Sequence, residues 1–164
     1  MESRLHLRDR RKLRPDLPDN CLRCGLYQDC KSYKIGARLF YSPPIGSELL
    51  STALLCAMNP GIEEDRENEI LIGKSGKLLM EYVEEYLSDH IVYVSNAVKC
   101  YIPSENFNKK GEIPLANIRY CNEFLKQDIE FIKPDIIVGL GKIACQALDL
   151  LGVEYIKSHH PSYI

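Results

Sequence analysis

Apolar residues occur along the chain in two patterns, short continuous runs and stripes with helical spacing. The runs are typical of strands that are buried on both faces of a sheet. They cover residues 53–59, 90–96, 135–141 and 153–157. The stripes repeat every three or four positions and predict helices. They lie within residues 78–87, 118–132 and 143–151. Gly76, just before the first stripe, is expected in the turn that leads into this helix.

Strands that alternate with helices predict an α/β fold with a mostly parallel sheet covered on both faces. We therefore expect a three-layer sandwich whose central sheet has four strands. In such sheets ligands bind beyond the carboxyl ends of the strands. The residues at or just after these ends are Asn59, Asn96, the 139–141 glycine turn and His160. The 102–114 connection is a long loop of the kind that usually carries function.

The length of 164 residues suits one domain with a real core. Hydrophobic residues make up 45% and charged residues 27% of the chain, which argues against disorder over most of its length. No apolar stretch approaches the roughly 18 residues that span a bilayer, and the N-terminus is charged where a signal peptide is apolar. We therefore predict a cytoplasmic protein with no membrane partner.

Charge is distributed unevenly although the net charge is only -2. Within the first 15 residues six arginines and lysines oppose two acidic residues, so 6 minus 2 gives +4. We expect residues 1–18 to form a basic N-terminal arm and residues 19–164 to form a single domain. The arm could bind phosphates, and a solvated tail explains the same composition.

Cysteines are numerous, with seven in the chain, and disulfides are rare in the cytosol. A metal centre is therefore the leading explanation for some of them. Cys21 and Cys24 have the two-residue gap that lets two thiolates bind one centre. Cys56 and Cys145 lie inside apolar segments and are expected in the core.

Cys100 and Cys121 are the candidates that complete a ligand set, with Cys30 in reserve. Cys121 shares its helical stripe with Ile118 and Leu125, so core packing is an alternative for it. Four thiolates could hold either zinc or a 4Fe-4S cluster. The spacing of the cysteines does not choose between these two.

Each polar residue at a strand end has two interpretations. Asn59 lies in an Asn-Pro-Gly turn of a common type, but its amide also offers a donor and an acceptor. Asn96 ends an apolar strand, where its amide needs a partner. That partner is either backbone or a pyrimidine edge, since one carboxamide can donate to O4 and accept from N3–H of uracil. His160 is either a surface histidine or a site residue, with His159 as its competitor.

Taken in order, these segments resemble the iron-sulfur uracil-DNA glycosylases, usually called family four. The resemblance runs from Cys21 to the last residues. It rests on Cys-x-x-Cys, Pro-Gly followed by Glu-Glu-Asp, IGKSGKLL, VSNAVKC, a downstream cysteine, IIVGLGKIACQALDLLG and HPS. The glycine-rich and Asn-x-Val-Lys-Cys segments are similar to the family's VGRAGQLL and ITNVVKC. The resemblance implies a uracil-DNA glycosylase-like fold and a DNA repair enzyme that hydrolyses the N-glycosidic bond of uracil and leaves an abasic site.

The resemblance also implies roles for the matching residues. The ligands of a structural 4Fe-4S cluster would be Cys21, Cys24, Cys100 and Cys121. Asn96 would read a flipped uracil, and His160 would hydrogen-bond uracil O2 and stabilise its negative charge. Leu71 falls where the family contacts the uracil ring. The turn that would hold the hydrolytic water contains Met58, Asn59 and Gly61. The expected DNA contacts are Lys74, Ser75 and Ser162.

Several features depart from the family pattern. Met58 stands where the family has a glutamate, so we assign the water-positioning role to Asn59, as in branches of the superfamily whose motif reads Gly-Met-Asn-Pro-Gly. Leu71 replaces the aromatic residue that stacks on uracil. The 101–120 segment is longer than the family's usual gap between cysteines. The chain ends two residues after His-Pro-Ser, where the family normally continues.

Two other interpretations stay open. A glycosylase fold without catalysis would bind DNA or a partner protein, and Met58 and Leu71 favour this. A zinc-containing α/β domain of unrelated function would also explain the cysteines. If the chain is the enzyme, its partner is uracil-containing DNA, single- or double-stranded. A replication or repair protein is a further candidate partner.

Overall fold

A computed structural model describes residues 18–26, 36–44, 46 and 51–161. The basic arm, Cys30 and Ser162 lie outside these residues, so the predictions for them stay predictions. The strands are β1 (Arg38–Tyr41), β2 (Ser51–Ala57), β3 (His90–Asn96), β4 (Ile136–Leu140) and β5 (Ile156–Ser158). The helices are α2 (Asp19–Cys24), α3 (Ile62–Glu67), α4 (Lys74–Tyr86), α5 (Leu115–Ile132) and α6 (Lys142–Leu151), with a short 3-10 helix, η2, at Ser104–Asn106. In this part of the chain no helix is long and apolar enough to cross a membrane.

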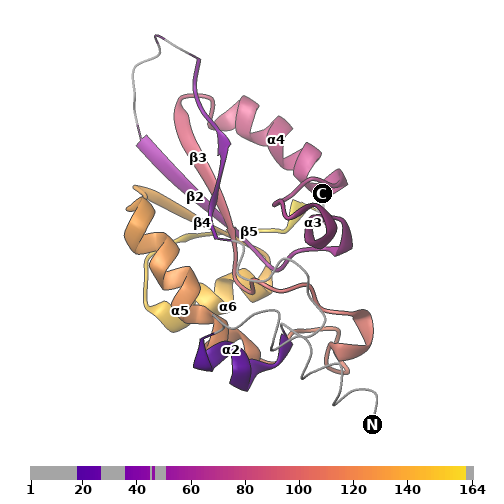
Figure 1. The fold of residues 1–164 in the computed structure, drawn as a ribbon. Helices are drawn as coiled ribbons and strands as arrows, with labels where there is room; N and C mark the ends of the chain where they lie inside the picture. The colour runs from indigo at the N-terminus through magenta and orange to yellow at the C-terminus, as the bar shows by residue number, and fades with distance from the viewer. Residues whose placement is uncertain (1–17, 27–35, 45, 47–50, 162–164) are drawn as a thin grey trace.

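The strands form one sheet in the order β1-β3-β2-β4-β5 (Figure 1). At its centre β2 pairs in parallel with β3 and with β4, and β4 pairs in parallel with β5. At one edge β1 runs antiparallel to β3. The predicted α/β class and mostly parallel sheet are therefore confirmed, with five strands in place of the four expected.

The two faces of the sheet are covered by different helices. Leu54 and Cys56 of β2 belong to an apolar cluster with buried residues of α5 and α6. Ala53 and Leu55, the alternate residues of the same strand, belong to a second cluster with buried residues of α4. Because successive side chains of a strand point to opposite faces, α5 and α6 cover one face and α4 covers the other (Figure 1).

Three short elements were not predicted from the sequence. Strand β1 has four residues without an alternating apolar pattern, and Leu39 within it is 57% exposed because the strand lies at the edge. Helices α2 and α3 have six residues each, which is too short for a helical stripe to stand out. The Cys21–Cys24 segment is therefore helical, which the spacing of its cysteines did not indicate.

The expectation that Gly76 lies in a turn before the helix is wrong. Helix α4 begins at Lys74, so Gly76 lies inside its first turn. A Cβ at this position would stand 1.6 Å from the carbonyl oxygen of Leu71, and Leu71 itself has a left-handed φ of 53°. The glycine is needed because the chain at Leu71 folds back onto the start of α4.

Candidate active site and cysteine-lined cavity

The carboxyl ends of β2 and β3 bring two predicted site segments together. Ala57 lies opposite Asn96 in the parallel pairing of these strands. Two further backbone bonds continue the pairing past the strand ends, from Ala97 N–H to Ala57 O at 2.8 Å and from Val98 N–H to Met58 O at 2.9 Å. The turn after β2 and the segment after Asn96 are thus held side by side, as expected from the positions of these residues at strand ends.

Asn96 occupies the position expected of a group that reads a ligand. The residue is 3% exposed and lies at the end of β3. No residue in the described ranges forms a hydrogen bond to its carboxamide. Among the described residues, the fully buried side-chain polar atom that lacks a hydrogen-bond partner is Asn122 Oδ1, so the Asn96 amide keeps contact with solvent and is open to a ligand. A ligand that presents a complementary donor and acceptor would satisfy it.

Asn59 uses one half of its amide within its own turn. The Nδ2 group donates to the carbonyl oxygen of Pro60 at 3.2 Å. Asn59 is half-buried, and Pro60 is buried. No side-chain bond to Asn59 Oδ1 is found among the described residues, which leaves this oxygen able to accept a hydrogen bond from water. The bond to Pro60 fixes the direction of that acceptor.

Glu64 is a candidate site residue that the sequence reasoning missed. It lies on α3, and its Oε2 atom is 2.7 Å from the position of a Cβ built on Gly61. Its Oε1 atom is 3.7 Å from a Cβ built on Gly73. The carboxylate therefore stands between the Asn59 turn and the glycine-rich segment. The Glu-Glu-Asp run that begins two residues after Gly61 was the available signal.

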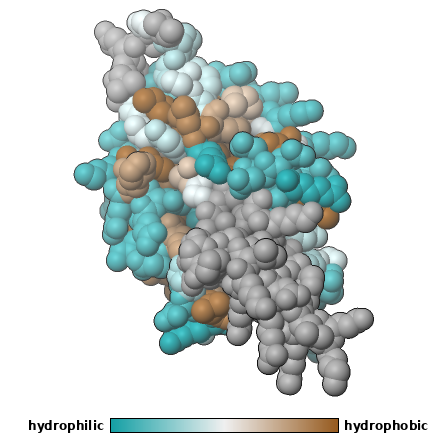
Figure 2. Space-filling view, in the orientation of Figure 1, coloured by the Kyte–Doolittle hydropathy of each residue, from teal (hydrophilic) through white to brown (hydrophobic). Residues whose placement is uncertain are grey.

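The surface around α3 is hydrophilic. Glu63, Glu67 and Glu69 are exposed there. Figure 2 shows hydrophilic side chains over this part of the molecule. Glu64, by contrast, is half-buried and turned toward the two glycines, which separates it from its neighbours in the acidic run.

His160 lies where strand β5 leads into the end of the described chain. It is half-buried, whereas His159 is exposed. Burial lowers the pKa of His160 below the ordinary histidine value. Gly141, with a left-handed φ of 89°, lies so close that a Cβ there would be 3.3 Å from the His160 Cβ. The glycine turn after β4 thus lies close to His160, and the choice of His160 over His159 as a site residue stays a prediction.

The remaining predicted contact residues flank this rim. Met58 packs against the apolar cluster on the α5–α6 face, and Leu71 packs against the cluster on the α4 face. Lys74 is exposed and Ser75 is half-buried at the start of α4. Their predicted roles toward uracil and DNA stay predictions. Ser162 lies outside the described residues.

The four cysteines of the predicted ligand set line one cavity. Cys21 and Cys24 come from α2, Cys100 follows β3, and Cys121 lies on α5. None of the four forms a disulfide, and all but the half-buried Cys24 are buried. The cavity is completed mainly by apolar side chains, including Leu26, Val98 and Phe124.

The other two described cysteines lie elsewhere. Cys56 and Cys145 are 0% and 4% exposed. Both were expected in the core, and this prediction is confirmed.

Polar contacts to the cavity sulfurs suit thiolates. The backbone N–H of Lys99 donates to Cys121 Sγ at 3.2 Å, and Asn117 Nδ2 donates to Cys24 Sγ at 3.1 Å. Bonds of this kind tune iron-sulfur centres. Burial raises the pKa of the Cys121 thiol to about 12, so a bound metal group would have to displace its proton.

A single zinc ion would need the four sulfurs close together. Zinc at a Zn–S distance of about 2.3 Å would draw four sulfurs to about 3.8 Å from one another. Within the described ranges no three Cys, His, Asp or Glu side chains converge in a way that could hold one metal ion.

The sequence matches the uracil DNA glycosylase superfamily over residues 43–164, and the chain belongs to this superfamily. It is 29% identical over 138 residues to a Type-4 uracil-DNA glycosylase of Archaeoglobus fulgidus, an alignment that covers 83% of this chain and 62% of the relative. The Type-4 uracil-DNA glycosylase of Pyrobaculum aerophilum is 28% identical over 139 residues, covering 84% and 64%. That of Saccharolobus solfataricus is 39% identical over 85 residues, covering 51% and 37%. The chain thus spans less than two thirds of the length of these curated relatives.

Proposed function

We propose that the protein is a uracil-DNA glycosylase that hydrolyses the N-glycosidic bond of deoxyuridine in DNA and leaves an abasic site. The observation that carries the proposal is the buried carboxamide of Asn96 beside the Asn59 turn. The names of the relatives, all uracil-DNA glycosylases, support the same reaction.

Recognition in this proposal begins with extrusion of the base. An enzyme cannot reach the glycosidic bond inside a duplex, so uracil has to leave the stack at a cost of a few kcal/mol. The Asn96 amide then donates to O4 and accepts from N3–H of uracil. Cytosine presents the reversed pattern, so an amide held in this one orientation rejects it. Because the protein leaves this amide without another partner, uracil would complete its hydrogen bonding.

His160 would act on the leaving base. Bond breaking leaves negative charge on uracil, and a donor positioned at O2 stabilises that charge where it develops. Burial favours the neutral imidazole, which still has one N–H to donate. The close packing of Gly141 restricts where the ring can lie.

Asn59 and Glu64 would act on the water. Asn59 cannot take a proton as a carboxylate does, so its part is to orient the water through Oδ1. The Glu64 carboxylate, beside Gly61, supplies negative charge near the same turn. A carboxylate there would favour positive charge on the sugar as the bond breaks, and would partly replace the glutamate that Met58 displaces.

A 4Fe-4S cluster is the proposed cofactor, held by Cys21, Cys24, Cys100 and Cys121. The cluster would supply a structural cross-link between α2, α5 and the segment after β3. The shared cavity, the absence of disulfides among these four cysteines and the N–H···S bonds support this assignment. Zinc is the alternative.

The proposed partner is uracil-containing DNA, single- or double-stranded. Lys74 and Ser75 at the start of α4, with Ser162 and the basic arm, are the proposed DNA contacts. A replication or repair protein and a cytoplasmic location stay predictions from the sequence.

Release of uracil from oligonucleotides tests the proposal. The protein is incubated with a single deoxyuridine in single-stranded DNA or in a duplex, and abasic sites are detected by alkaline cleavage. We expect cleavage at uracil and none at cytosine. The isosteric Asn96→Asp variant, which exchanges the amide donor for a second acceptor, should lose about 100-fold or more in kcat/KM.

A second candidate function follows from Met58, which packs in the core where the family has an acid. A glycosylase fold without turnover would bind uracil-containing DNA and release no base. Tight binding without abasic sites in the same assay would support this candidate and contradict the enzyme.

A further inference from the structure

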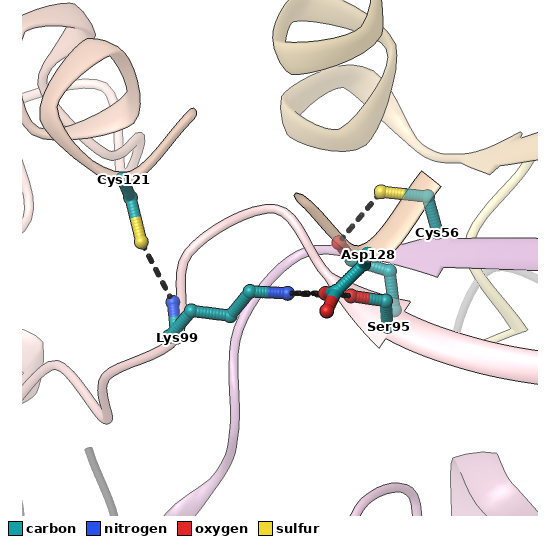
Figure 3. Close-up of polar contacts among 6 residues, drawn as sticks. Cys56, Ser95, Lys99, Cys121 and Asp128 are labelled. Atoms are coloured by element: carbon teal, nitrogen blue, oxygen red, sulfur yellow. Dashed lines mark hydrogen bonds and ion pairs between the residues drawn. The ribbon is translucent and has the colours of Figure 1, made fainter. Parts of the chain in front are cut away.

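A buried ionic network lies directly behind the proposed uracil reader. The Lys99 side chain is 1% exposed, and its Nζ donates to Asp128 Oδ2 at 2.6 Å and to Ser95 Oγ at 2.5 Å. Ser95 Oγ also donates to Asp128 Oδ2 at 2.7 Å. The three side chains therefore form a closed set of contacts (Figure 3). None of them has a part in the chemistry proposed above.

The network joins the two functional parts of the molecule. Ser95 is the residue before Asn96, and Lys99 is the residue before Cys100. The backbone N–H of Lys99 donates to Cys121 Sγ at 3.2 Å. Figure 3 shows Lys99 between Cys121 on one side and Ser95 with Asp128 on the other.

Both anchors of this segment lie on one helix. Cys121 and Asp128 are about two turns apart on α5. The 95–100 segment, which contains Asn96, is thus fastened to α5 near both ends.

Stability alone is a weak reason for such a network. Taking Lys99 and Asp128 out of water has a desolvation cost, and a buried ion pair can often be replaced by apolar side chains without loss of stability. Its best-attested use is to specify one arrangement of the chain. The arrangement specified here is that of the segment carrying Asn96.

Asn96 needs such a device because no described side chain orients it. Recognition groups have to be held within about 0.5 Å and 10–20° of their productive geometry. For Asn96 this restraint has to come through the backbone, from Ser95 on one side and Ala97 on the other. The Ala97 and Val98 amides are bonded to β2 and its turn, and Ser95 is bonded to α5 through Asp128 and Lys99.

We propose that Lys99, Ser95 and Asp128 are positioning residues that fix the Asn96 carboxamide for uracil by fastening the 95–100 segment to α5. The inference rests on the proposed function for its effect on uracil. Its structural part, the restraint of residues 95–98, can be measured without turnover.

The test replaces the whole network by apolar side chains in the full chain. The variant is Ser95→Ala/Lys99→Met/Asp128→Leu, which leaves no buried charge unpaired. The matched control is Lys126→Met/Glu130→Leu, which removes the ion pair between these two exposed residues at 3.9 Å on the same helix. Thermal unfolding and the absorption near 400 nm are recorded to compare folding and metal content.

The expected result is a folded triple variant with unchanged absorption but poor uracil recognition. The inhibition constant of free uracil should rise by about tenfold or more, and kcat/KM should fall by about 100-fold. Amide hydrogen exchange at Ala97 and Val98 should become faster. The control should differ from the unaltered protein by less than twofold in each measurement.

A triple variant with uracil inhibition, kcat/KM and hydrogen exchange all within twofold of the unaltered protein would overturn the inference. If the unaltered protein releases no uracil, the proposed function fails and the positioning role is decided by hydrogen exchange alone. If the triple variant does not fold, Asp128→Asn takes its place, since it keeps the shape and removes the charge. If Asp128→Asn leaves both the amide hydrogen exchange and the inhibition constant of uracil unchanged, the proposed positioning role of the network is wrong.

Discussion

The Glu64 carboxylate closes over Gly61, with Oε2 2.7 Å from where a Cβ of residue 61 would stand. A real Cβ cannot be so close to an oxygen, so the glycine is what lets the carboxylate reach the Asn59 turn. Glu64 lies on α3, which begins directly after Gly61. The Glu64 carboxylate thus approaches the Asn59 turn from the next helix, and we propose that it partly takes over the role of the acid that the family carries at position 58.

Gly61→Ala should displace Glu64 while the fold is kept, because the colliding atom is the end of a flexible side chain. We expect uracil release to fall by about tenfold or more, and Glu64→Gln to have a similar effect, since an amide removes the charge and keeps the shape. Glu63→Gln is the matched control, because Glu63 is exposed and pairs with Arg66. The rate of uracil release is measured by single-turnover kinetics. Full activity in Glu64→Gln would show that Glu64 takes no part in the reaction.

Asn59→Ala should lose most turnover and keep its melting temperature. The lost amide would leave the water without its acceptor, and misplacement of a reacting group costs about 100-fold. KM for the oligonucleotide should change little, because Asn59 does not contact the base in the proposed mechanism. Unchanged excision by this variant would show that Asn59 takes no part.

Cys121→Ser should lose the broad absorption near 400 nm that iron-sulfur proteins show. Serine provides a harder oxygen ligand in place of the sulfur that accepts from the Lys99 N–H. Cys145→Ser is the control, since Cys145 lies in the core away from the cavity, and its absorption should persist. Colourless unaltered protein that contains zinc by elemental analysis would contradict the cluster.

The strands that are buried on both faces of the sheet could be predicted from the sequence. The runs at β2, β3 and β4 are apolar on both faces because helices cover both, so the strands and their carboxyl ends could be found without contacts. Asn96 and the Asn59 turn followed from this, since parallel strands end at one rim. Edge strand β1 could not be found in this way, because its exposed residues carry no such pattern.

The parts that the sequence missed depend on contacts between distant residues. Lys99 looks like a solvated lysine until Asp128, on a separate helix, is found beside it. Glu64 looks like one acid in an exposed run until its approach to Gly61 and Gly73 is seen. Gly76 was assigned to a turn because the close approach of the Leu71 carbonyl has no sequence signal.

His160 should make stability depend on pH in the acid range. Burial lowers its pKa in the folded protein below the ordinary value of about 6.5, so the unfolded chain binds more protons at pH values near and below 6.5. Stability therefore rises with pH in this range. The contribution is fully present above about pH 6.5 and is lost as pH falls through the lowered pKa.

Chemical denaturation of the protein and of His160→Gln, measured between pH 5 and pH 8, should give a steeper pH dependence for the unaltered protein. His159→Gln, which removes the exposed histidine, should keep the steeper slope, and equal slopes for all three would contradict the burial of His160.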